Sequence, residues 1–477
     1  MLADAPRGAE PAYREAFARA QRLGRPVLAS WTRPIPQSDA IGFFAQADAS
    51  DERALWLRPS SGEALVGVGA AHVLTGRGAT RFSEIDAAWR DLLADAVIDD
   101  TGEAGAAGGP RLLGGFSFDP SQAPSGLWAG FSDGRMVLPE RLLVVRDGAT
   151  WLTTNVLAGP DGDDGRSAPT GQPTLLGRST TAQAAAAAQA DEAEADADAE
   201  EAAPGMAPEQ WQRLVGDTAG AIRRGELGLE KVVLARARRV HLPAPINARA
   251  LLRTLAEAYP SCTVFAIGHA QAMFVGATPE RLIALSNGLA TSMALAGSVS
   301  RGATLAEDEA LALQLLADPK EQAEHAVVVS ALRDGLTRAG LCTRIIADAQ
   351  PRVQKLPNLQ HLLTHVHGQV APGTSVLDLV ARLHPTPAVG GSPSAVALDF
   401  MRAHEKLDRG WYAGPLGWLD ASGNGEFVVG IRSALLRGRS ATLFAGCGIV
   451  AESQVAAEYA ESNWKLRPLL GALGVAE

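Results

Sequence analysis

Residues 425–470 read GEFVVGIRSALLRGRSATLFAGCGIVAESQVAAEYAESNWKLRPLL. The first half is rich in apolar and β-branched residues and is interrupted near Gly438, so it predicts two strand runs, over 425–438 and 440–450. A helical run follows near 454–473. Strand runs that form hairpins before a helix begins favour antiparallel sheets over a regular strand–helix–strand alternation.

The same pattern recurs along the rest of the chain. The sequence predicts strands over 111–120, 140–157, 231–242, 262–268, 272–278, 281–295 and 411–420, and helices over 11–23, 83–96, 211–224, 305–317, 319–339 and 376–383. We therefore expect an α+β fold in which large antiparallel sheets pack against helices.

One break in composition divides the chain. Residues 161–206 run through Gly, Asp, Ser and Pro and then through TAQAAAAAQADEAEADADAEEAAPG. A segment with so few large apolar side chains and so much acid cannot order itself in a core, so we expect a flexible insertion that activity does not require. It separates an N-terminal portion of the fold, 1–160, from a catalytic portion, 207–477.

Composition excludes several classes of protein. Hydrophobic residues make up 47% of the 477 and the net charge is −10, so the chain can build a large core but offers no clustered basic face for nucleic acid. No run approaches the roughly 20 apolar residues of a membrane span. Three widely spaced cysteines and a polar N-terminus without a signal sequence predict a cytoplasmic protein.

Two predicted helices each carry a pair of glutamates. Glu321 and Glu324 are three residues apart, as are Glu458 and Glu461, and each spacing places both side chains on one helix face. Two such faces could supply the oxygen ligands that Mg²⁺ prefers. Two solvated helix faces are the plainer alternative, and Lys465 four residues after Glu461 is also an ordinary helical ion pair.

Three charged residues stand beside or within apolar runs. Lys231 opens a strand, where a lysine is ordinarily solvated, but a buried lysine has a lowered pKa and can act as a general base. Glu280 follows a strand and is ordinarily a turn residue. Arg432 interrupts a strand, so it must reach solvent or a polar pocket, where it could bind a carboxylate. The histidines are interpreted as core or loop residues, at His361, His365, His367 and His384.

Several distinctive motifs follow one another along the chain. They are GGFSFDP (114–120), KVVLAR (231–236), VGATPERLI (275–283), LAGSVSRG (295–302), KEQAEHAVVV (320–329), LHPTPAVGGSP (383–393), WYAGPLGW (411–418), GIRSAL (430–435), FAGCGIV (444–450) and EYAESNWK (458–465). In this order they resemble the motifs of the chorismate-binding enzymes, the family of isochorismate, salicylate, anthranilate and aminodeoxychorismate synthases. The resemblance covers nearly the whole chain apart from the insertion, and it implies the fold of that family, two intertwined α+β halves.

The resemblance also implies roles for individual residues. Glu324 and Glu461 match the family's Mg²⁺ ligands, Glu321 and Glu458 match acids that support the metal through water, and Glu280 matches the general acid. The chorismate pocket is matched by Gly297, Ser298, Ala388, Arg432, Gly446 and Lys465.

Lys231 distinguishes between activities within the family. Members that use water as the nucleophile begin this strand with lysine, which fits the need for a base, whereas ammonia needs none. The resemblance therefore implies an isochorismate synthase, a monomer that needs no glutamine-hydrolysing partner, in a menaquinone or catechol siderophore pathway. Salicylate synthase, which goes on to eliminate pyruvate, is the first alternative. Anthranilate or aminodeoxychorismate synthase and a non-catalytic chorismate-binding subunit are the others.

Overall fold

The run GEFVVGIRSALL contributes to two different sheets. The sequence predicted one strand here, but the computed structural model forms β20 (Gly425–Val429) and β21 (Ser433–Arg437), separated by a sharp turn at Gly430 to Arg432. Arg432 has a left-handed backbone with φ of 51°, a conformation that breaks an extended strand. The single-strand prediction was therefore wrong, because this turn carries the chain from one sheet to the other.

The structure describes residues 10–160, apart from 49–50, 101, 103 and 123–124, and residues 204–475, apart from 358. Most of the predicted acidic insertion, 161–203, lies outside the described residues. No helix among the described residues is long and apolar enough to cross a membrane.

Twelve strands of the described residues form the first sheet, and nearly all of its pairs are antiparallel. Their spatial order is β18 (Gly391–Ser392), β10 (Lys231–His241), β22 (Ser440–Ile449), β21, β12 (Ala272–Thr278), β11 (Thr263–His269), β2 (Arg53–Arg58), β3 (Glu63–Val68), β8 (Arg141–Arg146), β9 (Ala149–Ala158), β1 (Val27–Ile35) and β5 (Val97–Asp99).

The second sheet has ten strands among the described residues. Their order is β15 (Cys342–Ala347), β17 (Leu359–Val370), β14 (Leu289–Ser300), β13 (Arg281–Ser286), β20, β19 (Pro415–Asp420), β6 (Arg111–Phe116), β7 (Gly134–Leu138) and β4 (His72–Gly76), with β16 (Arg352–Lys355) pairing with β17. The sequence Asn287-Gly288 turns β13 back into β14, and both residues have positive φ, as the tightest hairpin turns require.

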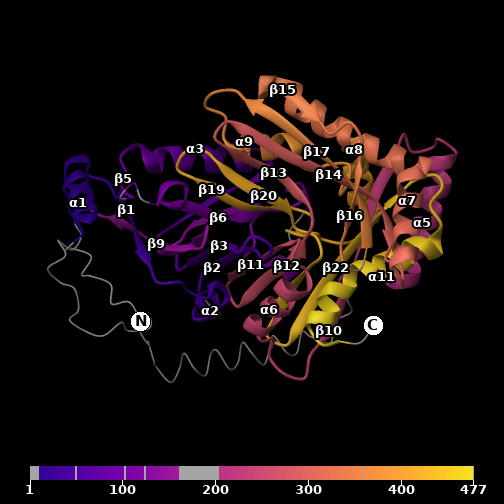
Figure 1. Ribbon diagram of the computed structural model, residues 1–477, viewed down its shortest axis with the longest axis horizontal. Helices are drawn as coiled ribbons and strands as arrows, with labels where there is room; N and C mark the ends of the chain where they lie inside the picture. The colour runs from indigo at the N-terminus through magenta and orange to yellow at the C-terminus, as the bar shows by residue number, and fades with distance from the viewer. Residues whose placement is uncertain are drawn as a thin grey trace.

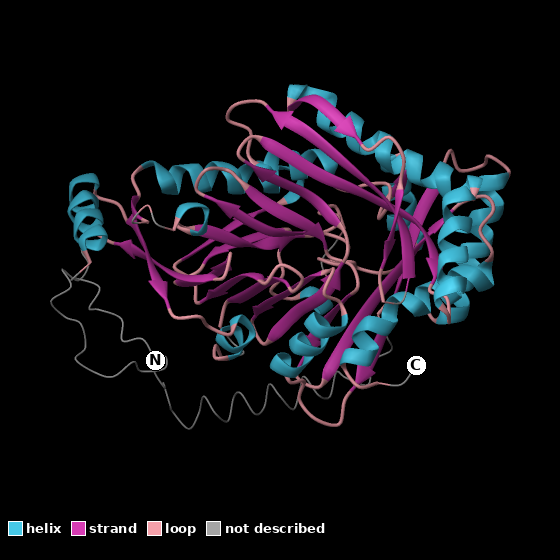
Figure 2. Ribbon diagram, viewed as in Figure 1, coloured by secondary structure: helices cyan, strands magenta, loops and turns pink. Residues whose placement is uncertain are grey.

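Helices flank the two sheets (Figures 1 and 2). The first sheet contacts α1 (Pro11–Leu23), α2 (Ala40–Ala45), α5 (Pro208–Arg223), α6 (Ala248–Ala258), α10 (Ser394–His404) and α11 (Val455–Ala472). The second sheet contacts α3 (Arg81–Ala94), α7 (Leu305–Ala317), α8 (Pro319–Thr337) and α9 (Val376–Leu383). Apolar side chains of both sheets share one large buried core.

In each sheet the strands from before residue 161 form one block, the strands from after residue 203 form another, and the two blocks meet at a single strand pair. In the second sheet β6 pairs with β19, and in the first sheet β2 pairs with β11. The portions before and after residues 161–203 therefore complete one another's sheets.

Candidate active site

Lys231 lies buried at the start of β10, with only 5% of its surface exposed. Its strand lies between β22 and the two-residue β18. Gly448 on β22 provides the space for the lysine, because a Cβ added there would lie 2.5 Å from Lys231 Cε. Lys231 Nζ donates to Glu324 Oε1 at 2.5 Å. The solvated strand-edge lysine, the plainer interpretation of the sequence, does not describe this residue.

Glu280 lies between β12 and β13 and is also buried, with 6% exposed. Its backbone N–H donates to Thr278 Oγ1, and its carbonyl accepts the Val429 N–H. Burial raises the pKa of its carboxyl to about 7, although Arg432 and Lys231 oppose the rise. A carboxyl with this pKa can carry a proton near neutral pH and donate it.

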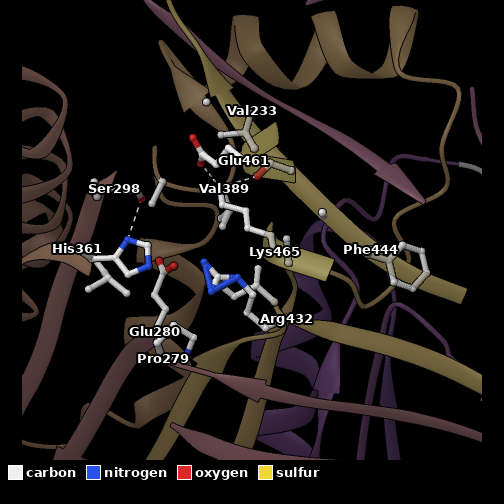
Figure 3. Close-up of a pocket in the computed structure, with 18 of the residues that line it drawn as sticks. Val233, Pro279, Glu280, Ser298, His361, Val389, Arg432, Phe444, Glu461 and Lys465 are labelled. Carbon is white, nitrogen blue, oxygen red and sulfur yellow. Dashed lines mark hydrogen bonds and ion pairs between the residues drawn. The ribbon is translucent and has the colours of Figure 1, made fainter. Parts of the chain in front are cut away.

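The turn between β20 and β21 points Arg432 into the same cavity as Glu280 (Figure 3). Burial lowers the pKa of its guanidinium. Among the described residues no side chain makes an ion pair with Arg432, although only 6% of the residue is exposed. A buried guanidinium without a carboxylate partner is suited to bind an anionic ligand.

The two predicted carboxylate helices, α8 and α11, meet at this cavity. On α11 Lys465 Nζ lies 2.5 Å from Glu461 Oε1 and donates to the Gly446 carbonyl at 2.8 Å. On α8 burial would raise the pKa of Glu324, but the positive charge of Lys231 on β10 holds this pKa below its usual range. Glu324, Glu461 and Lys465 all line the cavity.

Glu321 and Glu458 lie behind these residues and do not line the cavity. Glu321 Oε2 accepts the Ser298 N–H at 3.0 Å, and Glu458 Oε1 accepts the Ser453 hydroxyl at 2.7 Å. Burial raises the pKa of both carboxyls, to about 7 for Glu458, and their neighbours Glu324 and Glu461 add to the rise.

The chemistry of these glutamates suits a divalent cation. Glu324 adds to the raised pKa of Glu321, and Glu461 adds to that of Glu458, so each pair carries a repulsion that a bound cation would relieve. Their donors are oxygens, which Mg²⁺ prefers. Cys447, which sequence reasoning did not single out, has its Sγ within 4.8 Å of carboxylate oxygens of Glu458 and Glu461. Its thiol donates to the Glu458 carbonyl and is a soft ligand that a hard cation does not need.

His361 is the main cavity residue that the sequence interpretation missed. On β17 it lies opposite Ser298 of β14, and its Nδ1 is 2.8 Å from Ser298 Oγ. Burial, with Arg432, lowers its pKa to about 3, so the ring is neutral. Its buried Nε2 has no hydrogen-bond partner among the described residues. Figure 3 shows the ring between Ser298 and Glu280.

The remaining predicted pocket residues lie around the same space. Gly297 has φ of 78° at a bulge in β14, and a Cβ there would lie 3.1 Å from Glu321 Oε2. Ala388 also lines the cavity. Gly446 leaves room for Tyr412, whose hydroxyl would lie 3.1 Å from an added Cβ. Tyr412 also lines the cavity, and sequence reasoning did not name it.

The structure thus brings most of the sequence-predicted site residues together. They form one cavity that holds a lysine, a carboxyl with a pKa of about 7, an unpaired arginine and the edge of a carboxylate cluster. Such an arrangement can bind a small anionic molecule and transfer protons to and from it. The residues of the prediction that line it are Lys231, Glu280, Gly297, Ser298, Glu324, Ala388, Arg432, Gly446, Glu461 and Lys465.

Comparisons with known proteins agree with the predicted family. The chain matches the family model described as chorismate binding enzyme over residues 15–474. It is 35% identical over 467 residues to isochorismate synthase MenF of Bacillus subtilis (strain 168), covering 96% of each chain. It is 37% identical to the salicylate biosynthesis isochorismate synthase of Pseudomonas aeruginosa, covering 97% of this chain and 94% of the relative.

A solved structure confirms the predicted fold class. The structure of MenF, the menaquinone-specific isochorismate synthase from Escherichia coli, matches with a TM-score of 0.72 at 24% identity, covering 98% of this chain and 100% of that one. The ordered motifs, the shared fold and the match along almost the full length lead to one conclusion. The chain belongs to the chorismate-binding enzyme family.

Proposed function

We propose that this protein is an isochorismate synthase, an isomerase that converts chorismate to isochorismate. One observation carries the proposal. Lys231 and Glu280, a base candidate and a carboxyl with a pKa of about 7, line one buried cavity together with the unpaired Arg432. Relatives that match along nearly the whole chain are named isochorismate synthases.

In the proposed reaction Lys231 and Glu280 act as base and acid. Lys231 takes a proton from water as the water oxygen bonds to C2 of chorismate. The ring double bonds shift, the bond from C4 to its hydroxyl breaks, and Glu280 donates the proton that lets this oxygen leave as water. One water enters and one leaves, so the product is an isomer of the substrate.

Other side chains bind and orient the substrate. Arg432 and Lys465 supply positive charge for its two carboxylates. Glu324 and Glu461 would hold Mg²⁺, with Glu321 and Glu458 in support, and the bound cation would supply charge beside a substrate carboxylate. Neutral His361 keeps Ser298 in place through the hydrogen bond between them. Because the nucleophile is water, the proposed reaction needs no subunit that supplies ammonia.

Product analysis tests the proposal. Purified protein with chorismate and Mg²⁺ should form isochorismate without pyruvate, and a chelator should stop the reaction. Pyruvate with salicylate would instead identify a salicylate synthase, and binding without turnover would identify a chorismate-binding subunit. Relatives are named for menaquinone and for salicylate biosynthesis, and the proposal concerns the step that both share.

Lys231→Ala is the critical variant in this assay. Loss of the general base should lower turnover by roughly a hundredfold or more, with thermal unfolding measured to confirm that the variant folds. Full activity of Lys231→Ala would contradict the assignment of the base.

A further inference from the structure

The outer edge of β10 pairs with another strand only at its first two residues, and side chains bond to the backbone groups that follow. Beside this edge β18 pairs only with Lys231 and Val232. Farther along, the Val233 N–H donates to the Gly390 carbonyl at 2.9 Å. The next two polar groups on this edge bond to side chains: Arg409 Nη2 donates to the Val233 carbonyl at 2.8 Å, and the Ala235 N–H donates to Glu405 Oε2 at 2.8 Å.

Arg409 and Glu405 form a buried bidentate ion pair. Arg409 Nε and Nη2 donate to the two oxygens of Glu405, both at 2.6 Å. Their side chains are 2% and 3% exposed, and the guanidinium lies 4.4 Å from the ring centre of Phe118. A buried ion pair is by itself weak evidence for stability, because taking both charges out of water offsets much of their attraction. A role beyond stability is therefore worth testing.

The same guanidinium also holds the segment opposite β10. Arg409 Nη1 donates to the Val389 carbonyl at 3.0 Å, so one planar group joins the carbonyls of Val233 and Val389. Both valines line the cavity, and Ala388 lies beside Val389. The N–H groups of Val389 and Gly390 bond only within the segment, to the Thr386 carbonyl.

We propose that Arg409, oriented by Glu405, is a positioning residue. It holds the segment of residues 386–391, which contains Val389, at a set distance from β10. Arg409 itself also lines the cavity, but the hydrogen bonds it makes among the described residues go to protein acceptors, so we assign it to the wall and not to the reacting atoms. The proposal rests on the proposed function, because the positioned wall is the one that would contact chorismate. Lysine cannot replace arginine here, because a single ammonium lacks the fork that spans both carbonyls and the carboxylate.

Three variants test this role: Arg409→Lys, Arg409→Met and Glu405→Gln. Each loses at least one hydrogen bond to a charged group, so KM for chorismate should rise about tenfold, and more for Arg409→Met. Hydrogen exchange of amides 386–391 should become faster in each. Arg135→Lys is the matched control, since Arg135 on β7 forms an ion pair with Glu52 outside the cavity lining, and it should leave KM and this exchange unchanged.

The outcomes separate positioning from structure and from the proposed function. Variants that melt at lower temperature but keep wild-type KM, kcat and exchange over 386–391 would overturn the positioning role. If Arg409→Met does not fold, Arg409→Lys and Glu405→Gln decide the question. If the wild-type protein does not turn over chorismate, the proposed function fails, and the exchange measurement still shows whether Arg409 holds the segment.

Discussion

Gly448 determines whether Lys231 can occupy its buried position. A Cβ at Gly448 would lie 2.5 Å from Lys231 Cε and 3.1 Å from Lys231 Nζ. Gly448→Ala should therefore displace the lysine and lower kcat/KM for chorismate by about a hundredfold, the scale on which misplacing a reacting group by an ångström acts. Steady-state kinetics with a thermal unfolding curve check this expectation.

Gly471→Ala is the control for that substitution. Gly471 lies in α11, and its added Cβ would meet nothing within 4 Å. The variant should keep wild-type kinetics and gain slightly in stability, because alanine favours a helix over glycine. Equal losses of activity in both variants would contradict the steric explanation.

The raised pKa of Glu280 predicts the direction of the pH dependence. Burial raises it to about 7, so the carboxyl is protonated below that pH and loses its proton above it. A general acid must carry the proton, so kcat/KM should fall as pH rises through about 7. The pH profile of kcat/KM measures this.

Glu280→Gln is the variant that tests the origin of the alkaline limb. It should lower kcat by about a hundredfold to ten-thousandfold and should remove that limb from the profile. The same limb in Glu280→Gln would show that another group titrates.

At the scale of single elements, the first turn of α8 positions its two glutamates. Asp318 caps this helix, and its Oδ1 accepts the N–H groups of Lys320 at 2.8 Å and Glu321 at 3.2 Å. Asp318→Ala should cost about 1 kcal/mol of stability and should weaken Mg²⁺ binding, because the turn before Glu321 and Glu324 loses its anchor. Thermal unfolding and calorimetric Mg²⁺ titration measure the two effects.

The neighbouring helix offers a matched control. Thr304 caps α7 by accepting the Glu307 N–H at 3.2 Å, and α7 carries none of the proposed metal-site glutamates. Thr304→Ala should lower stability to a similar degree without changing Mg²⁺ affinity. Asp318→Asn, which keeps a capping side chain but removes the charge, should retain most Mg²⁺ binding. Unchanged affinity in Asp318→Ala would contradict the link between cap and site.

At the scale of the whole molecule, neither portion of the chain can complete its sheets alone. Without the N-terminal portion, β19 would lose β6 and β11 would lose β2, leaving unpaired strand edges that favour aggregation. A fragment of residues 204–477 should therefore show no cooperative unfolding transition, and co-expression with residues 1–160 should restore folding and activity. A fragment that folds and is active alone would contradict this expectation.

Sequence by itself determined the local features and the family. The hairpin around Gly438, the helices over 319–337 and 455–472, and the spacing of their glutamates depend on residues near one another in the chain, where propensity and periodicity act. Sequence reasoning failed at Gly430 to Arg432, because apolar composition continues through a turn that changes sheets.

Only the tertiary structure decided what the charged residues experience. Lys231 is buried because β18 and Gly448, far from it in sequence, surround it. Glu280 acquires its raised pKa from burial, and His361 reaches the cavity through its pairing with Ser298. Burial and pKa depend on neighbours that the fold brings together from different elements, so local sequence carries too little information to predict them.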